Sequence, residues 1–372
     1  MSDCRAEARF KILNSFMDRH GLAGLIVSDG TDRNKSGNQY FATGSSYSAG
    51  VSVFPRGGGP DDATFVIGVE QYKYVNSAQL FLPWIRYIKA GNSHVVKVLK
   101  EFGLAAGRIG VVGLSRIPVG LRAMLQKSLP EASLVDVTLD FERLRMAKDQ
   151  AGLRAMEESA KTLKASYFAF RASAVAGQSE YRVMAEVIKS GRDAGADGFS
   201  FMMRENPELR MAAGPSGGCL GVPSPDKTLA PDDVTLVEIK VCRGGFWTLI
   251  GRTFLTQAAP AELKKLYASF QEVEEAGIAA ARPGTKACDL YRAMTAAAKR
   301  LGVQEALLYE LGAGIGLDAR ERPFLTADDE TVLTEGMTLA VRAGGAGVTG
   351  GAVIADTIVI EKGGPRRLTA FA

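Results

Sequence analysis

Two apolar runs, DVTLVEIKVC at residues 233–242 and FWTLIGRTFL at residues 246–255, decide the fold class of the second half of the chain. Both are rich in β-branched and aromatic residues, a composition typical of strands. Further strands are predicted at residues 337–344 and 352–361. Helices are predicted from apolar residues at helical spacing at residues 179–195, 261–281 and 288–302. Helices grouped with an antiparallel sheet indicate an α+β domain.

The first half of the chain alternates between short helix and strand patterns. Helices are predicted at residues 9–20, 93–103 and 118–129, and strands at residues 23–28, 51–55, 63–68, 108–113 and 132–138. The segment NQYFATG, residues 38–44, is expected to be a strand or a turn, and residues 141–174 a long connecting helix. The alternation predicts an α/β domain with a mostly covered sheet over residues 1–148, followed by a second domain over residues 149–372.

Composition excludes several classes of function. The chain has 372 residues and a net charge of +4, with no Lys/Arg run of the kind that nucleic-acid-binding proteins show. No CxxC pair occurs among the four cysteines, so no zinc ribbon or dithiol site is expected. The first thirty residues lack a signal-peptide pattern, and no apolar run is long enough to span a membrane. We therefore expect a cytoplasmic protein without nucleic-acid or membrane partners.

A glycine-rich loop, LGAGIGL, occupies residues 311–317. Glycines at 312, 314 and 316 allow backbone to approach closely to another group, because they lack Cβ. Ala313, at the centre, can carry out neither acid–base nor metal chemistry. The retained glycines favour a pocket that is still used, although glycines can also persist for the fold alone.

The order of these segments resembles the creatinase/prolidase/methionine-aminopeptidase family, which has the pita-bread fold. The matching stretches are AAGPSGGCLGVPSPDKTLAPDDVTLVEIKV (212–241), GFWTLIGRTF (245–254), ARPGTKACDLY (281–291), LGAGIGLDARERPFL (311–325), LTEGMTLAVRAGG (333–345) and GGAVIADTIVI (350–360). The first half, notably NQYFATG, looks like the creatinase-type N-terminal domain. The resemblance implies an α/β creatinase-type domain followed by an α+β pita-bread domain, and a homodimer.

Active members of that family carry a two-metal site made of two aspartates, one histidine and two glutamates. The resemblance places Glu238, Leu249, Ala313, Arg342 and Ala355 at those five positions. Three of these side chains offer no metal donor, and an arginine repels a cation, whereas a divalent-metal site needs several converging oxygen or nitrogen donors. We therefore expect no metal cluster and no other cofactor.

The replacements suggest a different chemistry. Glu238 and Lys240 share one face of a strand, and Arg342 is expected to enter the same pocket. Arg342 and Lys240 could stabilise negative charge in place of a metal. The general base would be Glu238 if burial raises its pKa, or Lys240 if neighbouring cations lower its pKa. Alternatively, Arg342 and Glu238 only form a buried ion pair that fills a site without remaining activity.

Further side chains are candidates for binding the substrate. The resemblance matches Arg252 to a family arginine near the site and Arg320 to a second family histidine. It also implies that another family histidine, which carries protons, is absent here from the segment around Cys219. The candidate substrate-binding residues are Arg252, Arg320, Glu321, Tyr40, Tyr47, Cys219 and Asp356.

Three functions remain open from the sequence. The first is a metal-independent enzyme that acts on a small, anionic, carboxylate-bearing substrate by C–N hydrolysis or by lyase-type elimination. The second is a non-catalytic, ligand-binding subunit of the same fold, possibly paired with an active paralogue. The third and most distant is a metal-dependent Xaa-Pro aminopeptidase or dipeptidase.

Overall fold

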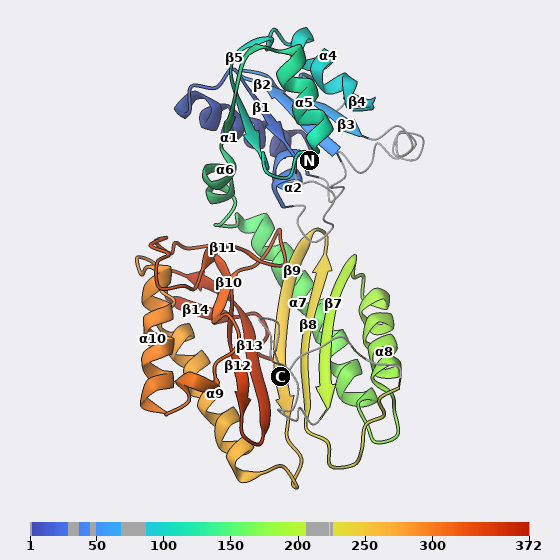
Figure 1. Ribbon diagram of the computed structural model, residues 1–372, viewed down its shortest axis with the longest axis vertical. Helices are drawn as coiled ribbons and strands as arrows, with labels where there is room; N and C mark the ends of the chain where they lie inside the picture. Colours follow the sequence, from blue (N-terminus) through green and yellow to red (C-terminus); the bar gives the residue numbers. More distant parts are fainter. Residues whose placement is uncertain are drawn as a thin grey trace. The chain divides into compact units, whose positions relative to one another are not determined.

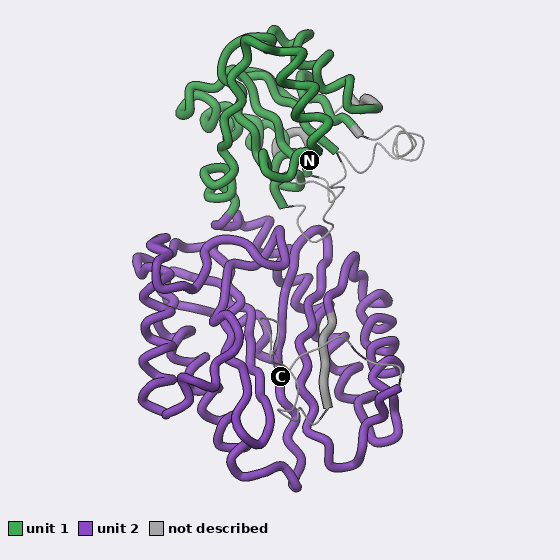
Figure 2. The backbone as a smooth tube through the Cα atoms, in the orientation of Figure 1, with its two compact units in different colours: residues 1–145 green, residues 146–372 purple. Residues whose placement is uncertain are grey.

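The chain folds into two compact units, residues 1–145 and 146–372 (Figure 2). The computed structural model describes residues 2–28, 37–44, 50–67, 87–205, 223 and 226–371 (Figure 1). Each unit has its own sheet and its own buried apolar core. No helix among these residues combines the length and the apolar character needed to cross a membrane.

The first unit is built on a six-stranded mixed sheet. Its strands are β1 (Gly24–Val27), β2 (Gly50–Pro55), β3 (Thr64–Ile67), β4 (Tyr87–Ala90), β5 (Ala106–Val112) and β6 (Glu131–Asp136). They lie in the order β4-β3-β2-β1-β5-β6, with β1–β5, β5–β6 and β3–β4 parallel. The helices are α1 (Ser2–Arg19), α2 (Gly37–Thr43), α4 (Ser93–Glu101), α5 (Val119–Ser128) and α6 (Thr138–Leu144). The expected α/β domain is thereby confirmed.

The segment NQYFATG is the helix α2, so the prediction of a strand or turn is wrong. Gln39 and Thr43 are buried on this helix. Gln39 Nε2 donates to Ser52 Oγ in β2 at 2.6 Å, and Thr43 Oγ1 donates to the backbone oxygen of Gln39 at 2.7 Å. Tertiary contacts thus override a weak local preference in this short segment. Tyr40 lies on α2 and is half-buried, whereas Tyr47 lies outside the described residues.

The second unit has an eight-stranded sheet, which confirms the expected α+β domain. Its strands are β7 (Gly198–Glu205), β8 (Thr235–Arg243), β9 (Phe246–Phe254), β10 (Gly312–Gly314), β11 (Glu321–Phe324), β12 (Thr338–Gly347), β13 (Gly350–Glu361) and β14 (Gly364–Arg367). Seven lie in the order β11-β10-β12-β13-β9-β8-β7, and β14 pairs with β13. The helices are α7 (Gln150–Ser173), α8 (Glu180–Asp193), α9 (Ala261–Ala280), α10 (Ala287–Arg300) and the 3-10 helix η3 (Gln304–Ala306).

Two helix layers divide this sheet into halves. Helix α7 packs on β8 and β9, and α9 packs on β12 and β13 (Figure 1). Each half buries its own apolar cluster: Phe170, Val187 and Ile239 belong to one, and Phe270, Met294 and Val341 to the other. The halves meet where β9 lies beside β13.

The predicted connecting helix over residues 141–174 is interrupted. Helix α6 ends at Leu144 and α7 begins at Gln150. Asp149 caps α7 by accepting a hydrogen bond from the backbone N–H of Gly152 at 2.7 Å. The backbone N–H of Lys148 donates to Gly336 O at 2.9 Å, which takes this residue out of the helical ladder. The prediction of one continuous helix is therefore wrong.

The seam between β9 and β13 has an unusual construction. Gly251 lies opposite Ala355, and a Cβ on Gly251 would approach the Ala355 Cβ to 3.0 Å. On either side of this pair, a threonine hydroxyl replaces the backbone ladder. Thr357 Oγ1 accepts from Leu249 N at 2.9 Å and donates to Leu249 O at 2.8 Å. Thr253 Oγ1 bonds Val353 N at 2.8 Å and Val353 O at 3.0 Å in the same way.

Removal of one seam hydroxyl should weaken the fold. Thr357→Val preserves the side-chain shape but leaves buried backbone groups of Leu249 without a partner, and an unsatisfied buried polar group costs about 1–3 kcal/mol. We expect the free energy of unfolding, measured by equilibrium urea unfolding, to fall by about that amount. Thr357→Ser keeps the hydroxyl and should remain closer to the unsubstituted protein. An equal loss in both variants would assign the stabilisation to methyl packing instead.

Candidate functional site

One row of residues crosses the sheet at the seam. In neighbouring strands, Arg342 lies opposite Ala355, Ala355 opposite Gly251, and Gly251 opposite Glu238. Residues directly opposite one another project from the same face of a sheet. Because Ala355 and Gly251 have almost no side chain, the long side chains of Arg342 and Glu238 can reach across the two strands that separate them.

Glu238, Lys240 and Arg342 form an ion triad, as the strand alternation predicted. Arg342 Nη1 donates to Glu238 Oε2 at 2.8 Å, and Lys240 Nζ lies 3.3 Å from Glu238 Oε1. Arg342 Nε donates to the backbone oxygen of Glu310 at 3.2 Å, and its guanidinium lies 5.1 Å from the centre of the Tyr309 ring. The Glu238 side chain is fully buried, whereas those of Arg342 and Lys240 are 18% and 20% exposed.

The triad holds Glu238 in its ionised form. Burial alone raises the pKa of this carboxyl, but the charges of Arg342 and Lys240 outweigh burial and lower the pKa below its ordinary value. A carboxylate with a lowered pKa is a weak proton acceptor. The condition under which Glu238 would serve as the general base, a raised pKa, is therefore not met.

The five positions matched to family metal ligands do not fit a metal centre. Leu249, Ala313 and Ala355 are buried and apolar, and they share the face of the sheet that carries Glu238 and Arg342. Of the five, only Glu238 has a donor, and that carboxylate is engaged by two cations. Within the described part of the chain, no group of three or more His, Cys, Asp or Glu side chains could hold a metal ion.

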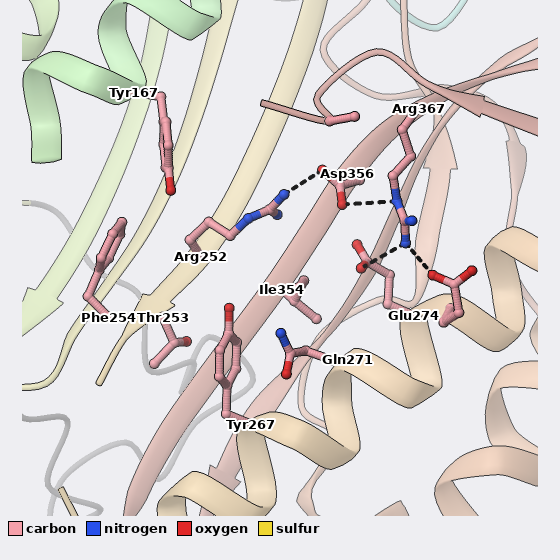
Figure 3. A pocket seen from close by; sticks show the side chains of 12 residues that line it. Tyr167, Arg252, Thr253, Phe254, Tyr267, Gln271, Glu274, Ile354, Asp356 and Arg367 are labelled. Carbon is pink, nitrogen blue, oxygen red and sulfur yellow. Dashed lines mark hydrogen bonds and ion pairs between the residues drawn. The ribbon is translucent and has the colours of Figure 1, made fainter. Parts of the chain in front are cut away.

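Arg252 and Asp356 lie on the opposite face of the sheet from the triad. Each follows directly after a residue of the crossing row, Gly251 or Ala355, and successive side chains of a strand point to opposite faces. Arg252 Nη2 donates to Asp356 Oδ1 at 2.8 Å, on the side where α7 and α9 pack (Figure 3). The structure therefore does not bring these two predicted substrate-binding residues together with Arg342.

Arg320 and Glu321 are also engaged in contacts of their own. Arg320 forms a double hydrogen bond with Glu310, at 2.6 and 2.8 Å, and is half exposed at the edge of the triad. Glu321 is buried and forms an ion pair with Lys148. Its other oxygen accepts from the backbone N–H of Asp318 at 3.3 Å. Glu321 therefore anchors the glycine-rich loop to Lys148.

The glycines of residues 311–317 lie where a Cβ would meet neighbouring backbone, at Gly312 and Gly314, or the buried Lys148 side chain, at Gly316. A Cβ would come within 2.3 Å of Ala340 O at Gly312, within 2.3 Å of Arg322 O at Gly314, and within 2.5 Å of Lys148 Cε at Gly316. Gly312 also has a φ of 149°, which favours glycine. Of the two interpretations of this loop, these contacts support persistence for the fold.

Several residues that contribute to the site were not predicted from the sequence. Tyr309 and Glu310 contact Arg342. Their position directly before the glycine-rich loop was the feature of the sequence that could have identified them. No local pattern marked Lys148, because its partner Glu321 is 173 residues away. Cys219, a predicted binding residue, lies outside the described residues.

Comparison with known proteins agrees with the two-unit architecture. Residues 9–147 match the Creatinase/Prolidase N-terminal domain, and residues 151–362 match Metallopeptidase family M24. The chain is 27% identical to the "Uncharacterized peptidase YqhT" of Bacillus subtilis over 363 residues, covering 96% of each chain. It is 26% identical over 272 residues to the "Agropine synthesis cyclase" of Rhizobium rhizogenes, covering 67% of this chain and 65% of the cyclase.

A solved structure shows the same fold. The prolidase from Pyrococcus horikoshii OT3 superimposes with a TM-score of 0.82 at 22% identity, covering 97% of this chain and 98% of the prolidase. The fold and the order of domains expected from the family resemblance are thereby confirmed. The chain belongs to metallopeptidase family M24 and carries a creatinase/prolidase-type N-terminal domain.

Proposed function

We propose that this protein is a metal-independent member of its family that binds a small carboxylate-bearing molecule at Arg342 and Lys240. The ion triad carries this proposal. Two cations and one carboxylate occupy the face of the sheet that holds the five positions matched to metal ligands. The triad therefore has one positive charge in excess, which favours an anionic ligand.

The unused donors of the triad suit a carboxylate. Arg342 uses Nη1 and Nε for Glu238 and Glu310, and among the described residues no hydrogen bond reaches its Nη2. Lys240 keeps donors beyond its single contact with Glu238. A guanidinium fork beside an ammonium group can hold a carboxylate through charge-assisted hydrogen bonds.

The reaction that this arrangement supports is C–N hydrolysis or elimination. Arg342 and Lys240 can stabilise negative charge that develops on a substrate oxygen, without a metal ion. Glu238 positions both cations and stays ionised. Lys240 binds and stabilises anionic groups as the charged ammonium, and it is the candidate proton acceptor of the triad only after that group has lost a proton. The similarity to a protein named as a cyclase supports a search beyond peptide substrates.

The Glu238–Arg342 ion pair also favours a second candidate. An arginine already bonded to a buried carboxylate can close a former site, and the protein would then act as a non-catalytic, ligand-binding subunit. A metal-dependent Xaa-Pro dipeptidase is the third candidate, for which the prolidase-like fold is the support. We propose a cytoplasmic homodimer for the first and third candidates, and a cytoplasmic subunit paired with an active paralogue for the second.

Native mass spectrometry can test metal binding and assembly together. We expect the purified protein to appear as a dimer without bound divalent metal, because the five positions supply one carboxylate that is already paired. Added manganese should leave the melting temperature unchanged. A stoichiometric metal adduct, with manganese-dependent stabilisation, would restore the dipeptidase candidate. A mixed complex with a related chain would favour the subunit candidate.

Substitution of Arg342 tests the anion site directly. A thermal-shift screen of small amino, guanidino and carboxylic acids should identify a stabilising acid, whose affinity is then measured by calorimetry. Arg342→Ala should weaken that affinity by about 10- to 100-fold, since a hydrogen bond between charged groups contributes roughly 1.5–3 kcal/mol. Arg342→Lys, which keeps the charge but loses the fork, should give an intermediate affinity.

The matched control is Arg292→Ala. Arg292 is an exposed arginine on α10 that pairs with Asp289, so its loss removes a similar ion pair away from the triad. This variant should bind the acid as the unsubstituted protein does. Equal affinities of all three variants would exclude Arg342 from binding.

The lowered pKa of Glu238 predicts how stability depends on pH. The stabilisation from its ionised form is present above the unfolded-state pKa of about 4.3 and is lost as pH falls toward the folded-state pKa. The difference in unfolding free energy between the unsubstituted protein and Glu238→Gln should therefore be constant near neutral pH and should shrink below about pH 4.3. Urea unfolding between pH 3 and pH 7 measures it. A difference that grows on acidification would contradict the ion triad.

A further inference from the structure

A cavity lies on the helix side of the sheet, behind the seam. Its volume is about 550 Å³, within the range of small-molecule sites. It is formed by β9, β13 and β14 together with α7 and α9 (Figure 3). The charged side chains that line it are Arg252, Glu274, Glu275, Asp356 and Arg367. The cavity is on the opposite face of the sheet from the ion triad.

The two arginines of this cavity already have anionic partners. Arg252 donates to Asp356 Oδ1 at 2.8 Å and to the backbone oxygens of Gly251 and Ala355 at 2.7 and 2.8 Å. Arg367 Nη2 bonds Glu275 Oε2 at 2.5 Å, and its Nε lies 3.3 Å from Asp356 Oδ2. These contacts pair both cations with carboxylates other than Glu274.

Glu274 is the carboxyl that lacks a close partner. Its side chain is 2% exposed, and its nearest cationic nitrogen, Arg367 Nη2, is 3.9 Å from Oε2. Oε1 is buried and accepts no hydrogen bond. A buried ionised carboxylate without a partner is costly, because it has lost its water without a replacement. Glu274 has only the long ion pair with Arg367, so a proton or a cationic ligand closer to it would stabilise it further.

The charges lining the cavity leave room for one more positive charge. Arg252 and Arg367 supply two, whereas Glu274, Glu275 and Asp356 supply three negative charges when ionised. Burial, followed by the charge of Asp356, raises the pKa of Glu274 well above its ordinary value. In the empty cavity a proton can therefore supply the missing positive charge.

The remaining wall of the cavity suits an organic group. Tyr167, Phe254 and Tyr267 present aromatic rings on the side away from Arg367 (Figure 3). Aromatic faces attract organic cations and also pack against alkyl chains. A metal ion is disfavoured, because no three carboxylates in the described residues converge in a metal-binding group.

We propose that this cavity binds a small organic monocation, a primary amine in its ammonium form, with the nitrogen beside the Glu274 carboxylate and the alkyl group extending toward the aromatic wall. Glu274 gives up its proton to solvent on binding, and the ammonium group takes its place. Net charge is conserved, because one positive charge enters as one proton leaves. No covalent bond forms or breaks in the ligand.

Propylammonium chloride is a suitable probe, with propan-1-ol as its neutral counterpart and sodium chloride as the control for ionic strength. We expect propylammonium to raise the melting temperature of the full chain in a saturable manner, whereas propan-1-ol and sodium chloride do not. Calorimetry at pH 6 in two buffers of different ionisation enthalpy should detect proton release on binding. No saturable effect of propylammonium, or an equal effect of propan-1-ol, would overturn the proposal.

Glu274→Gln locates the site. The amide keeps the shape of the side chain but cannot become anionic, so propylammonium affinity should fall by about tenfold or more and proton release should disappear. Glu272→Gln is the matched control, since Glu272 lies on the same helix and pairs at the surface with Arg300. It should bind as the unsubstituted protein does.

A third variant separates this cavity from the ion triad. Arg342→Ala should retain propylammonium binding, because the two sites lie on opposite faces of the sheet. Failure of the proposed function at the triad would therefore leave this test unaffected. Binding that persists in Glu274→Gln, or that is lost in Arg342→Ala, would show that the amine binds elsewhere.

Discussion

The pairing of Gly251 with Ala355 is the constraint on which the second unit depends. Two halves, each with its own helix layer and apolar cluster, become one sheet only where β9 meets β13. Small residues at the centre permit the close approach, and the hydroxyls of Thr253 and Thr357 satisfy backbone groups on either side. Larger side chains at the centre would force the strands apart, because a Cβ at Gly251 already meets Ala355.

The same pair separates two charged environments of opposite sign. On one face, Glu238 faces two cations; on the other, Arg252 and Arg367 face three carboxylates. Arg252 links the helix-side cavity to the seam, since it donates to the backbone oxygens of Gly251 and Ala355. The ion triad and the helix-side cavity therefore lie on opposite faces of the same short stretch of β9 and β13, around Gly251 and Ala355.

The candidate site shows which inferences strand alternation supports. Alternation placed Glu238 and Lys240 on one face, and the structure brings both Lys240 and Arg342 to the Glu238 carboxylate. The same rule could have separated Ala355 from Asp356, because adjacent residues of a strand cannot share a face. Asp356 was expected beside Arg342 because of the family motif, whereas strand alternation places Asp356 on the other face. The condition for Glu238 as a base, a raised pKa, is not met for another reason, since the charges of Arg342, from a distant strand, and of Lys240, on the same strand, lower that pKa.

The fold class, the order of domains and most helices and strands follow from the sequence, because periodicity and residue identity are local properties. The sequence also shows that four of the five positions matched by the resemblance to metal ligands lack a metal donor. Other features became apparent only from the tertiary structure. They are the interruption of the helix before Gln150, the helix at NQYFATG, the role of the glycines at 312, 314 and 316, and the partner of Lys148. The tertiary structure also shows that Glu274 is a carboxyl short of a cation. These features depend on groups far apart in the chain, whose distances and burial exist only after the sheet and helices have packed.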